Sequence, residues 1–162
     1  MTAIGELERL IALEGIRRVK AEYFAAIDEK RWSDLHDLFA PNAEFGPFWA
    51  AGAPESVQQF VDGVRTTFAD VHTIHVAFMP MIDLLDAEHA EGRWSMQDTL
   101  SWAPDTFNFR DSTVPGQRGA VGKGVYRDRY ERDAEGTWRI SFTSLQRLSI
   151  EAVVDPTLSM PV

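Results

Sequence analysis

Two carboxylates of this 162-residue chain lie in phase with apolar residues that should form a core. Asp98 shares the alternation of Trp94 and Met96, and Asp128 shares that of Tyr126. On a strand with one buried face, residues of the same parity point to the same side of the sheet. Both carboxylates are therefore expected among apolar side chains, where a charged group is costly and often serves a chemical role.

Two further groups could complete an acid–base site. The segment HTIHVAFMPM has two largely apolar faces, so at least one of His72 and His75 should be removed from water. Asp28 ends a helical stripe, where the negative end of the helix dipole and nearby aromatic rings should raise its pKa. A carboxylate and an imidazole in one apolar pocket would form a dyad in which the carboxylate supports the imidazole as a base. A tyrosine hydroxyl beside them could polarise a carbonyl or a leaving oxygen.

Each of these residues also has a structural explanation. A lone buried histidine or aspartate most often makes a structural hydrogen bond or caps a turn. Asp128 could form surface ion pairs, as its neighbours Arg127 and Arg129 also could, and Asp28 could cap the turn before Trp32. The aromatic residues, 11% of the chain, could fill a core instead of lining a pocket.

Composition and motifs exclude several classes of function. The chain has 25 Asp and Glu against 16 Lys and Arg, and this net charge of -9 disfavours nucleic acid and anionic membranes as partners. It has no cysteine, so thiolate chemistry and disulfides are excluded. It has no GxSxG motif of serine hydrolases, no GxxxxGKS/T phosphate-binding loop and no HExxH zinc motif. His72 and His75 should point to opposite faces of a strand, which also disfavours a metal site. These missing motifs lead us to expect a protein that needs no metal and no cofactor. Because the sequence shows no signal peptide and no 18-residue apolar run, we expect a cytoplasmic protein.

The apolar spacing changes along the chain from a helical to a strand-like period. Helical spacing predicts helices over 4–29, 32–39 and 57–68. Alternation predicts strands over 72–82, 87–102, 120–132 and 137–148. Such segregation indicates an α+β domain in which a cone-shaped, curved antiparallel sheet wraps around three N-terminal helices. We expect one domain over 1–162, with helices over about 4–68, the sheet over about 71–148, and a C-terminal segment, 149–162, that covers a cavity or contacts another subunit.

Four segments of the chain resemble one family. They are IRRVKAEYFAAIDEKRWSDLHDLFAPNAEF, TIHVAFMPMIDL, AEGRWSMQDTL and YRDRYERDAEGTWRIS. Together they are similar to the SnoaL-like branch of the nuclear transport factor 2-like superfamily, which implies an α+β cone. Within it the chain looks similar to cofactor-free lyases of the scytalone dehydratase, bile-acid 7α-dehydratase and hexachlorocyclohexane dehydrochlorinase types.

The resemblance implies roles for individual residues. Asp28 in IDEKRW and His75 in TIHVAF match the catalytic carboxylate and histidine of these lyases, and Tyr23 in EYF and Asp98 in RWSMQD match further catalytic positions. The chain also departs from the pattern, because Phe78 stands where such sequences often carry a second histidine. Asp28 and His75 are therefore the minimal machinery.

These observations favour a cofactor-free lyase or isomerase, foremost a dehydratase, acting on a small hydrophobic ring compound of polyketide, steroid or aromatic type. An apolar cavity should bind it, with a wall of Phe24, Trp49, Phe60, Phe78, Trp94, Met96 and Tyr126. Two alternatives remain open: a non-catalytic module that binds a small ligand, and an epoxide-type hydrolase in which two aspartates bracket a water. A partly apolar outer sheet face predicts a homo-oligomer, either a trimer or a dimer.

Overall fold

The computed structural model describes residues 5–47, 52–103, 106 and 113–154. Over these residues the chain forms three helices and one six-stranded sheet. The helices are α1 (Glu6–Asp28), α2 (Trp32–Asp37) and α3 (Val57–Phe68). The strands are β1 (Phe39–Phe45), β2 (His72–Ala77), β3 (Met81–Leu84), β4 (His89–Ser101), β5 (Gly119–Arg132) and β6 (Trp138–Val153).

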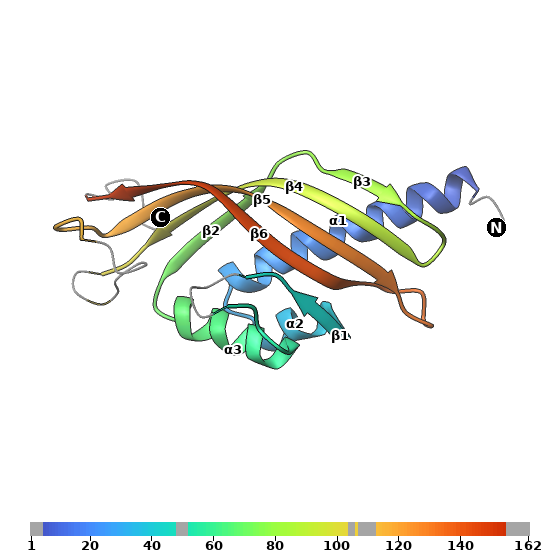
Figure 1. Cartoon of the computed structure of the whole chain (residues 1–162), viewed down its shortest axis with the longest axis horizontal. Helices are drawn as coiled ribbons and strands as arrows, with labels where there is room; N and C mark the ends of the chain where they lie inside the picture. Colours follow the sequence, from blue (N-terminus) through green and yellow to red (C-terminus); the bar gives the residue numbers. More distant parts are fainter. Residues whose placement is uncertain (1–4, 48–51, 104–105, 107–112, 155–162) are drawn as a thin grey trace.

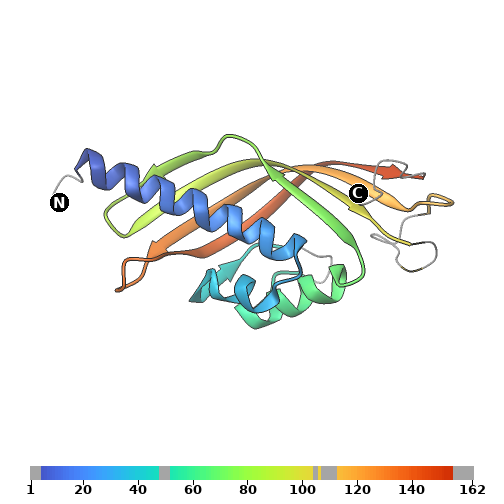
Figure 2. The same cartoon turned by 180° about the vertical axis from the view of Figure 1, so that it is seen from behind.

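The strands lie in the order β1-β6-β5-β4-β2, and β3 also pairs with β4. The pairing of β1 with β6 is parallel and the others are antiparallel. The sheet is curved, α1 lies along its concave side, and α2 and α3 lie together beside β1 (Figure 1, Figure 2). The predicted α+β fold, with N-terminal helices packed against a mostly antiparallel sheet, is confirmed. No helix in the described part of the chain is long and apolar enough to cross a membrane.

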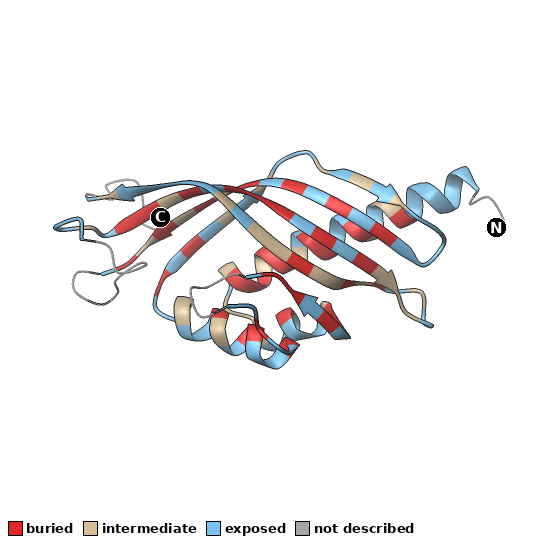
Figure 3. Ribbon diagram, viewed as in Figure 1, coloured by how far each residue is buried: buried red, intermediate tan, exposed pale blue. Residues whose placement is uncertain are grey.

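Burial alternates along the two central strands, as their sequences predict (Figure 3). On β4 the even-numbered residues from Ala90 to Leu100 are buried and most of the odd-numbered ones are exposed. The same parity holds along most of β5, where Tyr126, Asp128 and Tyr130 face inward. One face of each strand therefore contacts the helices and contributes to the core.

Two predicted boundaries are wrong. The segment 72–82 is not one strand but two, because the chain leaves the sheet around Pro80, whose nitrogen has no hydrogen to donate. The second helix ends at Asp37, and β1 begins at Phe39 and contains Pro41. A proline is tolerated there because β1 is an edge strand, and its register with β6 shifts between Phe39 and Glu44.

The sheet extends into the predicted C-terminal segment. Residues 149–153 continue β6 and pair with β5. Residues 155–162 lie outside the described part of the chain, so the expectation that 149–162 covers a cavity or contacts another subunit stays a prediction.

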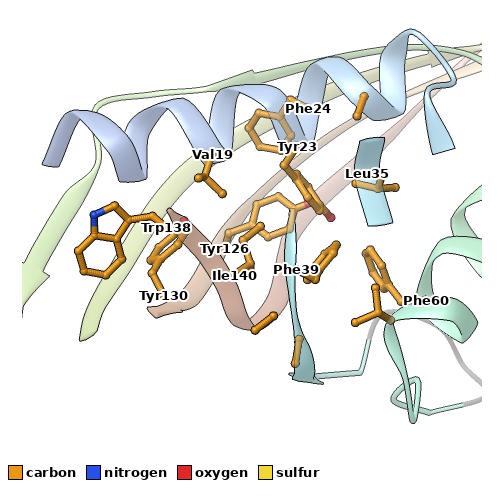
Figure 4. Close-up of a cluster of buried hydrophobic side chains, with 14 of the residues drawn as sticks. Val19, Tyr23, Phe24, Leu35, Phe39, Phe60, Tyr126, Tyr130, Trp138 and Ile140 are labelled. Atoms are coloured by element: carbon orange, nitrogen blue, oxygen red, sulfur yellow. The ribbon is translucent and has the colours of Figure 1, made fainter. Parts of the chain in front are cut away.

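The main core lies between α1 and the concave face of the sheet (Figure 4). Its centre is aromatic: the rings of Phe45 and Phe60 stack with centroids 4.7 Å apart, and Tyr23 meets Phe39 edge to face at 6.1 Å. Large rings of this kind bury much apolar surface and fix the distance between helix and sheet. They therefore hold the C-terminal part of α1 against β1 and α3.

Candidate active site

A carboxylate at the end of α1 and a histidine on β2 form a close pair. The Oδ1 atom of Asp28 lies 2.7 Å from Nδ1 of His75, and Oδ2 accepts a hydrogen bond from the His75 backbone N–H at 2.8 Å. Because a carboxylate can only accept, Nδ1 donates and the neutral ring carries its lone pair on Nε2. The His75 side chain is 4% exposed. The two residues therefore form a dyad with the geometry that orients a histidine base.

Two other side chains support Asp28. Thr73 donates a hydrogen bond from Oγ1 to Asp28 Oδ1 at 2.8 Å, and Lys30 donates from Nζ to Thr73 Oγ1 at 3.2 Å. Partial burial opposes the charge on Asp28, but the hydrogen bonds from His75 and Thr73 outweigh it and lower the pKa of Asp28. The predicted upward shift is wrong, because the sequence pattern does not reveal these donors.

The Nε2 side of His75 faces a second carboxylate. His75 is directly opposite Asp98 on β4, and Asp98 is directly opposite Gly122 on β5. The distance from His75 Nε2 to Asp98 Oδ2 is 3.9 Å, which is beyond hydrogen-bond length. The imidazole thus lies between two carboxylates, with one hydrogen-bonded to it.

Asp98 is itself bound by an arginine from β6. Arg147 donates from Nη1 to Oδ1 at 2.7 Å and from Nη2 to Oδ2, so the contact is bidentate. Burial works against the charge of Arg147, but the contact with Asp98 outweighs it and raises the pKa of Arg147. Arg147 reaches across β5 at Gly122, where a β-carbon would lie 2.2 Å from both Arg147 Nη1 and Asp98 Oδ1. Glycine at this position leaves the space that the ion pair occupies.

The aromatic layer next to the dyad contains two tyrosines. Phe24 stacks on the His75 ring with centroids 5.4 Å apart and planes at 12°, and it also contacts Tyr126. Burial raises the pKa of Tyr23 well above its usual value, and a hydrogen bond to Tyr126 adds to this effect. The hydroxyls of Tyr23 and Tyr126 are thus paired, and both rings contact Phe24, which stacks on His75.

A buried ion pair lies below this layer. Lys20 Nζ is 2.8 Å from Asp128 Oδ2, and neither side chain is exposed. The ammonium also lies 3.6 Å from the centroid of the Tyr126 ring, a close cation–π contact. Asp128 accepts further hydrogen bonds from Tyr130 at 2.8 Å and Thr143 at 2.7 Å. Burial lowers the pKa of Lys20, while the attraction of Asp128 opposes that shift.

The structure brings most of the predicted residues together. Asp28, His75 and Asp98 lie together between α1, β2 and β4, Tyr23 is separated from His75 by the Phe24 ring, and the predicted burial of Asp98 and Asp128 is confirmed. The predicted wall residues that are buried are Phe24, Phe60, Trp94, Met96 and Tyr126. Their role in binding, and the apolar cavity itself, stay predictions.

One predicted wall residue is misplaced. Phe78 is 53% exposed and follows Ile74 and Val76, which are also exposed on the outer side of β2. It therefore does not belong to the interior, because inward positions on this strand are odd-numbered. Trp49 lies outside the described residues.

The sequence interpretation missed two cations. Lys20 has a detectable signal, since it falls on the buried stripe of α1 between Ile16 and Tyr23. Arg147 has none in simple alternation, because β6 changes register with β5 near Lys123 and again near Arg129. Each shift reverses the parity that points inward.

Solved structures of similar shape include two hexachlorocyclohexane dehydrochlorinases. One, LinA type 2, is 16% identical with a TM-score of 0.79 over 97% of this chain and 99% of that one. The other, LinA-type3 from Novosphingobium barchaimii, is 17% identical with a TM-score of 0.79 over 97% and 100%. A candidate scytalone dehydratase from Novosphingobium aromaticivorans is 18% identical with a TM-score of 0.71 over 90% of each chain. At such identities the likeness establishes the fold, which is that of nuclear transport factor 2-like proteins.

The sequence also matches a family directly. Residues 8–144 fit the SnoaL-like domain, a match that spans nearly all of α1, every strand up to the first part of β6, and all the groups described above except Arg147. Because this match covers most of the chain, the protein belongs to the family of SnoaL-like domains.

Proposed function

We propose that this protein is a cofactor-free lyase of the dehydratase type, acting on a small hydrophobic ring compound. The observation that carries the proposal is the dyad: Asp28 fixes the proton of His75 on Nδ1, so that Nε2 is the basic atom beside an aromatic layer. Structural neighbours named as dehydrochlorinases and a candidate dehydratase support the reaction class, since elimination is common to both.

In the proposed reaction His75 Nε2 removes a proton from a carbon next to a carbonyl or another activating group. The electrons of that bond form a carbon–carbon double bond, and the bond to the leaving hydroxyl breaks. The proton carried by His75 then passes to the departing oxygen, so water leaves and the imidazole returns to its neutral state. Asp28 stabilises the imidazolium that forms between these steps.

Tyr23 has the second role in this proposal. Its hydroxyl is paired with that of Tyr126 beside the dyad, and burial keeps both phenols protonated at neutral pH by raising their pKa. A phenol in a dry site is a strong donor to an oxygen that gains negative charge. Tyr23 would therefore stabilise the developing oxyanion or assist the leaving group.

The proposal is tested by Asp28→Asn and His75→Gln, with His72→Gln as the matched control. His72 lies on the same strand as His75 but is exposed. Turnover is measured on a panel of hydroxylated steroids and polyketides, and urea unfolding of each variant confirms that it folds. We expect the two dyad variants to lose at least about 100-fold in kcat, as removal of a general base usually causes, and the control to retain its rate. Full turnover in both dyad variants would refute the proposal.

A binding module without catalysis is the second candidate. It is favoured by the way in which the buried charges satisfy one another, since Asp98 and Asp128 each have a cation in contact. Native mass spectrometry of the purified protein separates the two: a retained ligand that is returned unchanged favours the module. The hydrolase alternative fits less well, because the His75 ring, and not a space for water, lies between Asp28 and Asp98.

A further inference from the structure

The position of His75 poses an electrostatic problem for a base. Asp28 lies at 2.7 Å from one ring nitrogen and Asp98 at 3.9 Å from the other. A negative charge within about 4–6 Å favours the protonated form of a histidine, and two of them favour it more. An imidazole held as a cation between two carboxylates has no lone pair with which to accept a proton.

We infer that Arg147 keeps His75 available as a base by cancelling the charge of Asp98. Both oxygens of Asp98 are bound by the guanidinium, so the field of this carboxylate at the ring is largely opposed by the cation beside it. On this account Asp98 and Arg147 are positioning residues that act through His75, and Asp98 is not the acid that protonates the leaving group. The inference rests on the proposed function of His75 as the base.

The other charged groups around His75 are consistent with this assignment. From α1 the ring meets Asp28 and the neutral ring of Phe24, and the turn after α1 brings Lys30 to Thr73. From β4 comes Asp98 and from β6 Arg147, while β5 offers only the neutral Tyr126 beside Phe24. Two carboxylates are thus matched by two cations, and removal of Arg147 would leave one negative charge in excess.

The ion pair between Arg147 and Asp98 requires a glycine at position 122 of β5. Gly122, near the start of β5, contributes no side chain to the sheet, and glycine inside a strand weakens it. A β-carbon at that position would collide with both members of the ion pair. Arg147 therefore reaches Asp98 across a glycine of β5, and the register shift near Arg129 gives it the same parity as the buried Thr143.

The test compares Arg147→Met, Asp98→Asn and the double variant by NMR titration of the His75 imidazole, which needs no substrate. We expect the midpoint of this titration to rise by about 1 to 2 pH units in Arg147→Met and to fall in Asp98→Asn. In the double variant, where both charges are absent, it should return to within about 0.5 units of the wild-type value. Arg127→Met is the matched control, because Arg127 is exposed on the outer face of β5 and lines an open hollow there.

The results separate this inference from others. Equal shifts in Arg147→Met and Arg127→Met, or a double variant that shifts as far as Arg147→Met, would overturn it. If Arg147→Met does not fold, Asp98→Asn and the double variant, which bury no unpaired carboxylate at this site, still decide the outcome. If the dyad variants retain full turnover while the His75 titration shifts as expected, the charge effect is correct and the proposed function is wrong.

Discussion

The buried pair of Lys20 and Asp128 allows a sharp test of how the interior is held together. The two charged atoms are 2.8 Å apart and both side chains are fully buried. Lys20→Met keeps the length of the side chain but removes the ammonium, so Asp128 would keep its hydroxyl donors and lose its counter-charge. Removal of one partner of such a pair typically lowers the free energy of unfolding by about 3–5 kcal/mol. Domains of this kind have about 5–15 kcal/mol in all, so the loss should be conspicuous.

The assay is urea unfolding followed by tryptophan fluorescence, since Trp94 is buried and donates a hydrogen bond to Tyr130 at 3.0 Å next to the pair. With a slope of about 2 kcal/mol per molar urea, the midpoint should fall by about 1.5–2.5 M. Arg17→Met is the control, because Arg17 forms an exposed ion pair with Glu14 at 3.7 Å on the same helix and such pairs contribute little.

The double variant Lys20→Met with Asp128→Asn decides the interpretation. It has no buried charge at this position and loses mainly the hydrogen bonds that an amide cannot replace, about 1–2 kcal/mol. It should therefore be more stable than Lys20→Met alone, although it carries one more substitution. A double variant less stable than the single one, or a single variant no less stable than Arg17→Met, would refute the reasoning.

Three more measurements probe other parts of the site. The chain has three tyrosines and all are buried with raised pKa values: Tyr23, Tyr126 and Tyr130. The stability that these raised pKa values contribute is present below about pH 10 and is lost as the pH rises further. Tyrosinate absorbance at alkaline pH should therefore appear only as circular dichroism reports unfolding. Ionisation of the tyrosines near pH 10 in the folded protein would contradict this. Gly122→Ala should cost about 1–3 kcal/mol in urea unfolding and displace Arg147, whereas Gly5→Ala, where a β-carbon meets nothing within 4 Å, should change little. Thr73→Val removes a hydrogen bond to Asp28, whose lowered pKa stabilises the fold above about pH 4. The free energy of unfolding of the variant should therefore fall by about 1 kcal/mol at pH 7 and by less below pH 3.8. An equal loss at both pH values would count against this reasoning.

The regular strands of the sheet were predictable from sequence, and so were the residues that they bury. β4 has one covered face throughout, so simple alternation in the sequence identifies Asp98 as an inward carboxylate. The same reasoning identifies Asp128 on β5. These two strands lie in the middle of the sheet, where both neighbours enforce the pleat.

Their partners were not predictable in the same way. The cation that meets Asp98 is 49 residues away on a strand that shifts register twice, so no fixed period connects the two. Phe78 shows the related limit, because both faces of 72–81 are largely apolar in the sequence, so the pattern does not reveal that the even-numbered residues face outward. Alternation states which face a residue occupies but not which strand lies beside it.

One of the two buried ion pairs lies next to the histidine that we propose as the base. Lys20 and Arg147 each neutralise a buried carboxylate, and buried pairs of this kind add little to stability over apolar residues of similar size. The buried Nε of Arg147 has no hydrogen-bond partner among the described residues, and Nε2 of His75 lies 3.9 Å from Asp98, beyond hydrogen-bond length. Gly122 in β5 leaves the space in which Arg147 and Asp98 form their ion pair beside His75. An ion pair that adds little to stability and lies beside the proposed base fits the positioning role that we propose for Asp98 and Arg147.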